Sequence, residues 1–153
     1  MRYIGIDPGG KNNGVIMLEG DVVIFARNIR ERENLFTFIE RTLKELHDAA
    51  RQDYVFIIES YFLDPDKLTY ESTIHASHII EIIGALKYII PLSHIIFQKP
   101  AAKRMFADKV ASDEFYDVHI RDAYLHVLCF KEMKKEKKEE NIVGMDVDYK
   151  NVV

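Results

Sequence analysis

Ile4-Gly5-Ile6-Asp7-Pro8-Gly9-Gly10 joins an apolar run near the start of the chain to a turn rich in glycine. Residues 3–6 predict a buried strand that ends at Asp7, and residues 8–14 predict the turn that follows it. A carboxylate at this place loses hydration unless a cation or hydrogen-bond donors satisfy it. We therefore interpret Asp7 either as the cap of a turn or as part of a functional site.

The strands and helices that follow indicate an α/β fold. Apolar runs at residues 15–18 and 22–26, separated by a short turn, extend the first strand into an antiparallel meander. Residues 54–58 are almost continuously apolar, which is typical of a strand buried on both faces, and residues 94–97 predict a fifth strand. Pro100 is suited to open a short helix. Apolar residues at helical spacing predict three long helices, over residues 31–51, from Thr69 or Ser72 to about Ile90, and over residues 115–138.

The length and composition favour a single domain. The chain has 153 residues, of which 48% are hydrophobic, and this is enough for one sizeable core. We expect one domain over residues 1–140, built on a mixed five-stranded sheet that combines the meander with two further strands and has helices on both faces. Residues 131–140 mix lysines with glutamates, which is typical of a solvated helix end, and residues 141–153 are expected to form a C-terminal tail.

Composition also limits the class of protein. The only cysteine, Cys129, excludes an intramolecular disulfide and is expected to be a small core residue. No apolar stretch approaches the roughly 20 residues of a membrane span, so we expect a cytoplasmic protein without a membrane anchor. The net charge of −4 does not exclude nucleic-acid binding, because a local basic stripe can carry the phosphate contacts.

Three further polar residues fall at places that suit a metal site. Glu59 closes the apolar strand at residues 54–58, and a parallel pairing of that strand with the first would bring Glu59 beside Asp7. His119 and Asp122 are three residues apart and therefore share one face of the last helix. Clusters of carboxylate oxygens are what Mg²⁺ and Mn²⁺ require.

These residues together resemble the RuvC family of Holliday junction resolvases, within the RNase H-like superfamily, over roughly residues 1–130 and more in the manner of its phage-encoded branch. The resemblance implies an RNase H-like fold and a homodimer that binds two Mg²⁺ or Mn²⁺ ions at each active site. Asp7, Glu59 and Asp122 match the three family carboxylates. His119 stands where many members have a fourth carboxylate, and its imidazole suits Mn²⁺ better than Mg²⁺.

The resemblance also implies residues that contact DNA. Phe62, helped by Tyr61, matches an aromatic that stacks on bases at the junction, although a loop aromatic folded onto the core would give the same pattern. The basic segment after the fifth strand is expected to contact phosphates, with Lys103 as the best match to the family. A solvated helix face is the alternative for each of its cations, which are Lys99, Lys103, Arg104 and Lys109.

The expected function is therefore the resolution of four-way junctions or other branched DNA by paired phosphodiester nicks. An RNase H-like nuclease acting on RNA or RNA/DNA hybrids would carry the same metal site, and a branched-DNA binding module without catalysis is a further alternative. Actin-like sugar kinases open with a similar motif, but they need two such domains to enclose a nucleotide. Small residues in the second long helix favour it as the dimer interface; they are Ala76, Gly84 and Ala85.

Overall fold

The computed structural model describes residues 1–61, 66, 69–111 and 114–149. Its strands are β1 (Arg2–Gly9), β2 (Asn12–Glu19), β3 (Val22–Arg30), β4 (Tyr54–Glu59) and β5 (Ile95–Gln98). Its α-helices are α1 (Arg32–Asp48), α2 (Tyr70–Ile89), α3 (Ala101–Arg104) and α4 (Val118–Tyr149), and two short 3-10 helices cover Leu92–His94 and Ala107–Lys109.

The five strands form one mixed sheet in the order β3-β2-β1-β4-β5. The pairs β1–β2 and β2–β3 are antiparallel, whereas β1–β4 and β4–β5 are parallel. The predicted meander and the predicted mixed sheet are both confirmed. Ile6 pairs with Ile58 in the parallel register of β1 and β4. Asp7 and Glu59, the residues that follow this pair, therefore lie at the same edge of the sheet.

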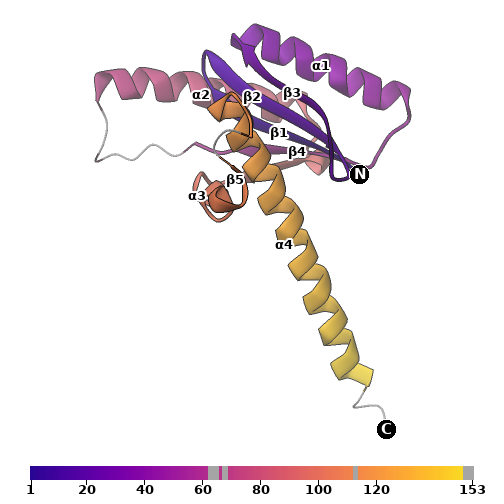
Figure 1. Cartoon of the computed structure of the whole chain (residues 1–153). Coiled ribbons are helices and arrows are strands. Elements are labelled where there is room, and N and C mark those ends of the chain that lie inside the picture. Colours follow the sequence, from indigo (N-terminus) through magenta and orange to yellow (C-terminus); the bar gives the residue numbers. More distant parts are fainter. Residues whose placement is uncertain (62–65, 67–68, 112–113, 150–153) are drawn as a thin grey trace.

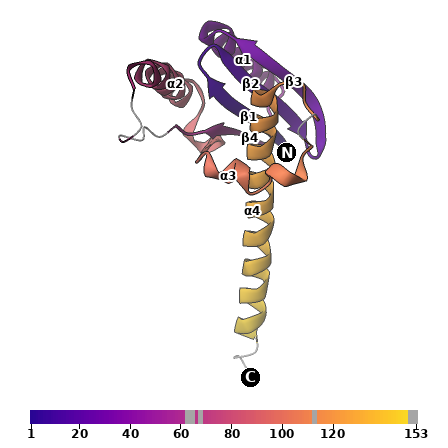
Figure 2. The ribbon, with the colours of Figure 1, turned by 60° about the vertical axis from the view of Figure 1, so that its left-hand side comes forward.

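Helices cover both faces of the sheet (Figures 1 and 2). The larger core lies between the sheet and helices α1 and α2, where Ile4 and Phe56 of the strands pack with Leu35 of α1 and Leu86 of α2. Side chains of this size contribute about 1.5–3 kcal/mol each when fully buried. A second core lies under α4 on the opposite face; it contains Ile16, Leu18, Val55, Ile57, Ala123 and Val127.

Two glycines let α4 lie directly on the sheet. A Cβ atom at Gly14 would stand 2.0 Å from the carbonyl oxygen of His119, and one at Gly5 would stand 2.6 Å from the carbonyl oxygen of Ala123. Only a residue without a side chain permits so close an approach of helix backbone to strand backbone. The sequence of β1 and β2 thus fixes how deeply the first turns of α4 sit against the sheet.

Helix α4 begins three residues later than the pattern predicts, because Asp117 caps it. Its Oδ1 atom accepts hydrogen bonds from the backbone N–H groups of His119 and Ile120 at 2.8 and 3.3 Å, and its Oδ2 atom accepts one from the amide of Asn28 at 2.5 Å. The cap therefore ties the start of α4 to β3. The helix continues to Tyr149, and the domain boundary after residue 140 stays a prediction.

The glycine-rich turn is shorter than predicted. The β1–β2 ladder already pairs Pro8 with Asn13, so that only Gly10, with a φ of 77°, and Lys11 remain in the connection. The buried side chain of Asn13 accepts a hydrogen bond from the Gly9 N–H and donates one to the carbonyl of Ile29. This amide takes up backbone groups that the tight connection would otherwise leave without partners.

Two smaller predictions are confirmed by the structure. Thr69, one of two predicted caps, is the residue that caps α2, and it forms a reciprocal capping box with Ser72. Cys129 is fully buried, as predicted, in a small cluster with Phe106, Val110 and Leu125 that joins α4 to the segment carrying α3. Across the described parts of the chain, the structure contains no helix that is long and apolar enough to cross a membrane.

Candidate active site

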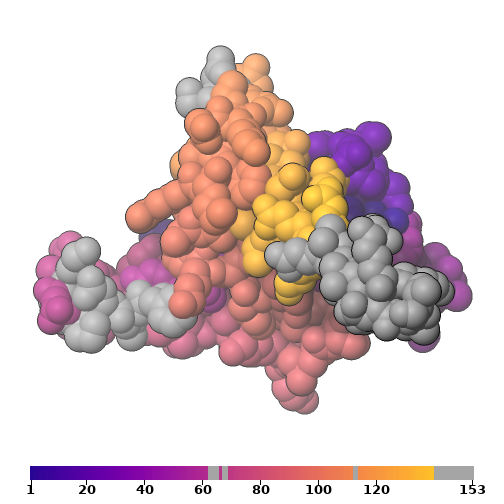
Figure 3. All heavy atoms as spheres, turned by 90° about the horizontal axis from the view of Figure 1, so that it is seen from below, coloured from indigo at the N-terminus to yellow at the C-terminus, as the bar shows by residue number. Residues whose placement is uncertain are grey.

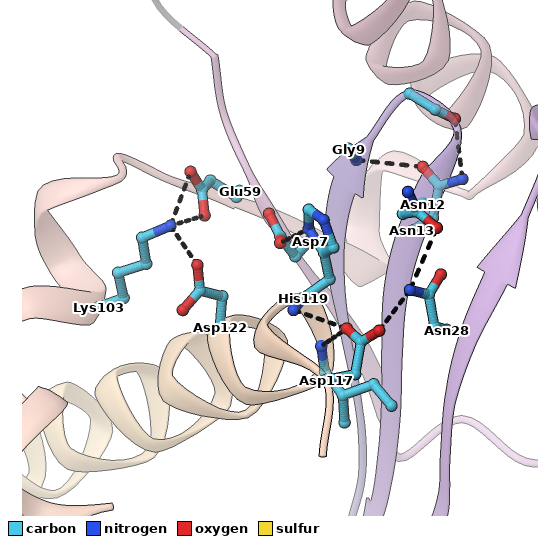
Figure 4. Close-up of polar contacts among 12 residues, drawn as sticks. Asp7, Gly9, Asn12, Asn13, Asn28, Glu59, Lys103, Asp117, His119 and Asp122 are labelled. Atoms are coloured by element: carbon cyan, nitrogen blue, oxygen red, sulfur yellow. Dashed lines mark hydrogen bonds and ion pairs between the residues drawn. The ribbon is translucent and has the colours of Figure 1, made fainter. Parts of the chain in front are cut away.

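The four predicted site residues converge at one edge of the sheet (Figure 4). Asp7 comes from β1, Glu59 ends β4, and His119 and Asp122 project from the first turns of α4. Two features of the sequence bring them together: the parallel register of β1 and β4, and the glycines that admit α4 to the sheet. The structure therefore gathers all four in one polar cluster.

Asp7 and His119 form a hydrogen-bonded pair in which Nδ1 of the imidazole lies 2.8 Å from Oδ2 of the carboxylate. Burial raises the pKa of Asp7 above its ordinary value, and the charge of Glu59 adds to this, although the bond from His119 opposes it. The same hydrogen bond raises the pKa of His119 above its ordinary value of 6.5. A neutral His119 that donates from Nδ1 keeps the lone pair of Nε2 for another partner.

Lys103, from α3, lies between the other two carboxylates (Figure 4). Its Nζ atom is 2.7 Å from Oδ2 of Asp122 and 3.0 Å from Oε2 of Glu59. Burial lowers the pKa of this lysine, but its bonds and charge interactions with the two carboxylates outweigh burial and raise the pKa overall. Lys103 is therefore a fixed ammonium ion inside the cluster. The predicted contact of Lys103 with DNA phosphates stays a prediction.

A fully buried histidine, His126, contacts the carboxylate of Glu59. Nε2 of His126 lies 2.9 Å from Oε2 of Glu59, and Nδ1 lies 2.8 Å from the amide of Gln98. Because a carboxylate can only accept, Nε2 is a donor, and His126 is either an imidazolium or a neutral ring that faces the NH₂ group of Gln98. Burial alone would raise the pKa of Glu59, but the bonds from His126 and Lys103 hold it below its ordinary value.

Sequence reasoning missed both His126 and Gln98 as part of the site. One signal was present, because His126 follows Asp122 by four residues and His119 by seven, so that all three occupy one face of α4. Gln98 lies directly opposite Glu59 in the parallel register of β4 and β5. The neighbour of Glu59 at the strand edge was therefore a candidate as soon as the two strands were expected to pair.

The cluster has the donors that a hard divalent cation requires, although they are not arranged as a closed site. Within the described ranges, no group of three or more His, Cys, Asp or Glu side chains is placed to hold a metal ion. Mg²⁺ is commonly bound by one or two carboxylates, with water and substrate phosphate completing its coordination. The buried carboxylate of Asp7, in one cluster with Glu59 and Asp122, indicates that such an ion fits here.

The segment that carries α3 lies beside α4 on one side of the molecule (Figure 3). Nη2 of Arg121 fastens it to α4 by donating to the carbonyl oxygens of Ala107 and Val110, at 2.7 and 2.9 Å. Three of its four predicted DNA-contacting cations are exposed; they are Lys99, Arg104 and Lys109. The ammonium of Lys109 also lies over the ring of Phe106.

The two aromatic residues predicted to stack on bases follow β4. Tyr61 is half-buried and lies two residues after Glu59. Phe62 lies outside the described residues, and its proposed stacking role stays a prediction.

No protein-family model and no curated protein matches the sequence. Among solved structures, RuvC from Thermus thermophilus in complex with a Holliday junction substrate matches with a TM-score of 0.56 and 15% sequence identity, over 84% of this chain and 92% of RuvC. The chain has the fold of RuvC. This result confirms the predicted RNase H-like fold class, and at 15% identity the likeness to RuvC establishes the fold alone.

Two other solved structures are similar at TM-scores below 0.5 and carry no weight. The yeast mitochondrial Holliday junction resolvase has a TM-score of 0.41 and 13% identity, over 72% of this chain and 55% of its own. An exopolyphosphatase from Cytophaga hutchinsonii has a TM-score of 0.40 and 10% identity, over 69% of this chain and 36% of its own. The functional assignment therefore depends on the chemistry of the site.

Proposed function

We propose that this chain is a metal-dependent endonuclease that resolves four-way DNA junctions, or related branched DNA, by paired phosphodiester nicks. One observation carries the proposal: in a RuvC fold, Asp7, Glu59 and Asp122 converge with His119 at one edge of the sheet. Burial of Asp7 beside the carboxylate of Glu59 costs hydration free energy. A metal-binding role accounts for that cost, whereas a purely structural role does not.

Asp7 would hold Mg²⁺ or Mn²⁺ in this site, and the neighbouring carboxylates of Glu59 and Asp122 would add negative charge around the ion. A divalent cation bound there would polarise the scissile phosphate and favour ionisation of the attacking water. His119 is held by Asp7 through Nδ1, so its Nε2 atom is the one that would bind the ion or orient that water. His126 keeps the Glu59 carboxylate in place and, with Lys103, favours its ionised form.

The exposed cations of the α3 segment are proposed to contact DNA phosphates. Lys99, Arg104 and Lys109 lie on the same segment as Lys103, whose ammonium is inside the carboxylate cluster. A strand bound along this segment would therefore pass beside the candidate site. Such contacts position the backbone without reading its sequence, which suits a protein selective for DNA shape. Phe62 and Tyr61 are proposed to stack on bases exposed at the branch point.

The two-fold symmetry of paired nicking favours a homodimer, and α2 offers a surface for it. Tyr70 and Tyr88 are 82% and 92% exposed, and Ile74 is 42% exposed. Gly84 is also exposed, with open space where a side chain would stand. Ala76, which the sequence had grouped with Gly84, is instead fully buried against the core. We propose that the exposed side of α2 forms the dimer contact.

A substrate panel tests this function. The full chain is incubated with labelled four-way junctions, three-way junctions, linear duplex DNA and RNA/DNA hybrids, in Mg²⁺, Mn²⁺ or EDTA. We expect nicks in opposed strands of the four-way junction that require metal. Cleavage of the hybrid alone would assign the site to RNA-directed hydrolysis. Tight junction binding with no cleavage in either metal would make the chain a binding module.

A further inference from the structure

The candidate site already contains one cation, Lys103, and it lies among carboxylates that have little access to water. The side chains of Asp7, Glu59 and Asp122 are 10%, 14% and 18% exposed. The Lys103 ammonium contacts two of these three, and Asp7 is the carboxylate that it does not contact. Asp7 instead holds His119, which contributes no formal charge when it is neutral.

The charges in this cluster favour a single divalent cation. The three carboxylates and the one ammonium together carry a formal charge of −2. One divalent cation neutralises that charge. A second would leave an excess of two positive charges in a site largely removed from water, and one substrate phosphate would offset only half of it. Unpaired charge is costly to hold in such surroundings.

The position of the ammonium points the same way. Nζ stands 2.7 Å from Oδ2 of Asp122 and 3.0 Å from Oε2 of Glu59, which are hydrogen-bond distances to one oxygen of each carboxylate. A divalent cation between these two carboxylates would meet the ammonium at close range, where the two charges repel one another. Among the described residues, Asp7 makes no contact with the ammonium, and its side-chain partner is His119.

We propose that the site binds one divalent cation, at Asp7, and that Lys103 supplies the positive charge that the resemblance in sequence assigns to a second ion. The inference rests on the proposed nuclease function and deepens it. An ammonium has three N–H donors, so Lys103 can bind Glu59 and Asp122 and still offer one donor to an oxygen of the scissile phosphate. Lys103 would then be a fixed element of the site, where the resemblance to RuvC had implied two exchangeable ions.

Counting bound Mn²⁺ tests the proposal without DNA or turnover. The full-length protein is dialysed to equilibrium against Mn²⁺, and the free ion is measured by its electron paramagnetic resonance signal. We expect the wild type to saturate at one ion per chain. Lys103→Met removes the charge and keeps the length of the side chain, so it should admit a second ion. Lys103→Arg should stay at one. Lys44→Met is the matched control. It makes the same substitution at a lysine of α1 that pairs with Asp48, so this variant should also bind one ion per chain.

Three outcomes would overturn the proposal: two ions on the wild type, no bound ion at all, or one ion on both the wild type and Lys103→Met. Circular dichroism melting shows which variants are folded, and Lys103→Gln replaces Lys103→Met if the latter is unfolded. The count also separates this inference from the proposed function. Junction cleavage by a chain that binds two ions would contradict the one-ion inference and leave the nuclease function standing. One bound ion without any nuclease activity would contradict the nuclease function and leave the one-ion inference standing.

Discussion

Nδ1 of His119 lies 2.8 Å from Oδ2 of Asp7, which joins helix α4 to strand β1 across 112 residues of sequence. The contact fixes the orientation of the imidazole and leaves Nε2 as the atom free to act on water or metal. Asp7 therefore has two roles in the cluster: it is a buried carboxylate, and it fixes the orientation of the His119 ring.

The metal preference should follow from His119. An imidazole nitrogen is a poorer ligand for Mg²⁺ than a carboxylate oxygen, whereas Mn²⁺ tolerates it better. We expect the wild type to cleave faster in Mn²⁺ than in Mg²⁺ at equal low concentration, and His119→Asp to narrow that difference. Metal titrations of the wild type, His119→Asp and His119→Ala provide the measurement. The same metal ratio and similar rates in all three would remove His119 from the chemistry.

The pH dependence should also report on His119. Its hydrogen bond to Asp7 raises its pKa above 6.5, so the protonated form persists to higher pH than in a free histidine. A protonated ring has no lone pair for water or metal. Cleavage should therefore begin to fall at a pH above 6.5 and continue to fall as the solution becomes more acidic. Rate–pH profiles at saturating Mn²⁺ test this. His119→Asp is the control, because its profile should lack the fall toward acidic pH that protonation of His119 causes. The same fall in that variant would show that a group other than His119 causes it.

His126 should act as a positioning residue for Glu59. His126→Leu removes the donor to the carboxylate, which should cost about 1–3 kcal/mol of stability and roughly 10–100-fold in cleavage rate. The pKa of Glu59 should rise, so the acid limb of the rate–pH profile should move to higher pH. His126→Gln, which can restore a donor, should recover part of both effects. A variant that loses stability but keeps the profile of the wild type would show that His126 only packs the core.

Much of this site could be predicted from the sequence because it depends on short-range patterns. The apolar runs before Asp7 and Glu59 predict two strand ends, and the spacing of His119 and Asp122 predicts a shared helix face. The contacts of Lys103 and His126 could not be predicted in this way. Glu59 lies 44 residues from Lys103 and 67 from His126, and both contacts depend on how α3 and α4 pack.

The close contact between α4 and the sheet gives a further test. Gly14→Ala would place a methyl group 2.0 Å from the carbonyl oxygen of His119, so the helix must move away from β2. We expect a loss of roughly 1–3 kcal/mol in unfolding free energy, as for other overpacked sites, together with a loss of cleavage. Chemical denaturation and the junction assay measure the two effects. Wild-type stability and activity in this variant would show that α4 does not need to lie so close.

The most direct test of the proposed nuclease compares cleavage and binding in single-atom variants of the carboxylates. Asp7→Asn, Glu59→Gln and Asp122→Asn each keep the size of the side chain and remove its charge. Metal-assisted phosphate chemistry depends on several kcal/mol of charge stabilisation, so each change should lower the nicking rate by on the order of 10³-fold. Gel-shift assays on the same preparations should show that four-way junctions are still bound. Metal-dependent nicking by all three variants at the wild-type rate would contradict the assignment of this cluster as an active site.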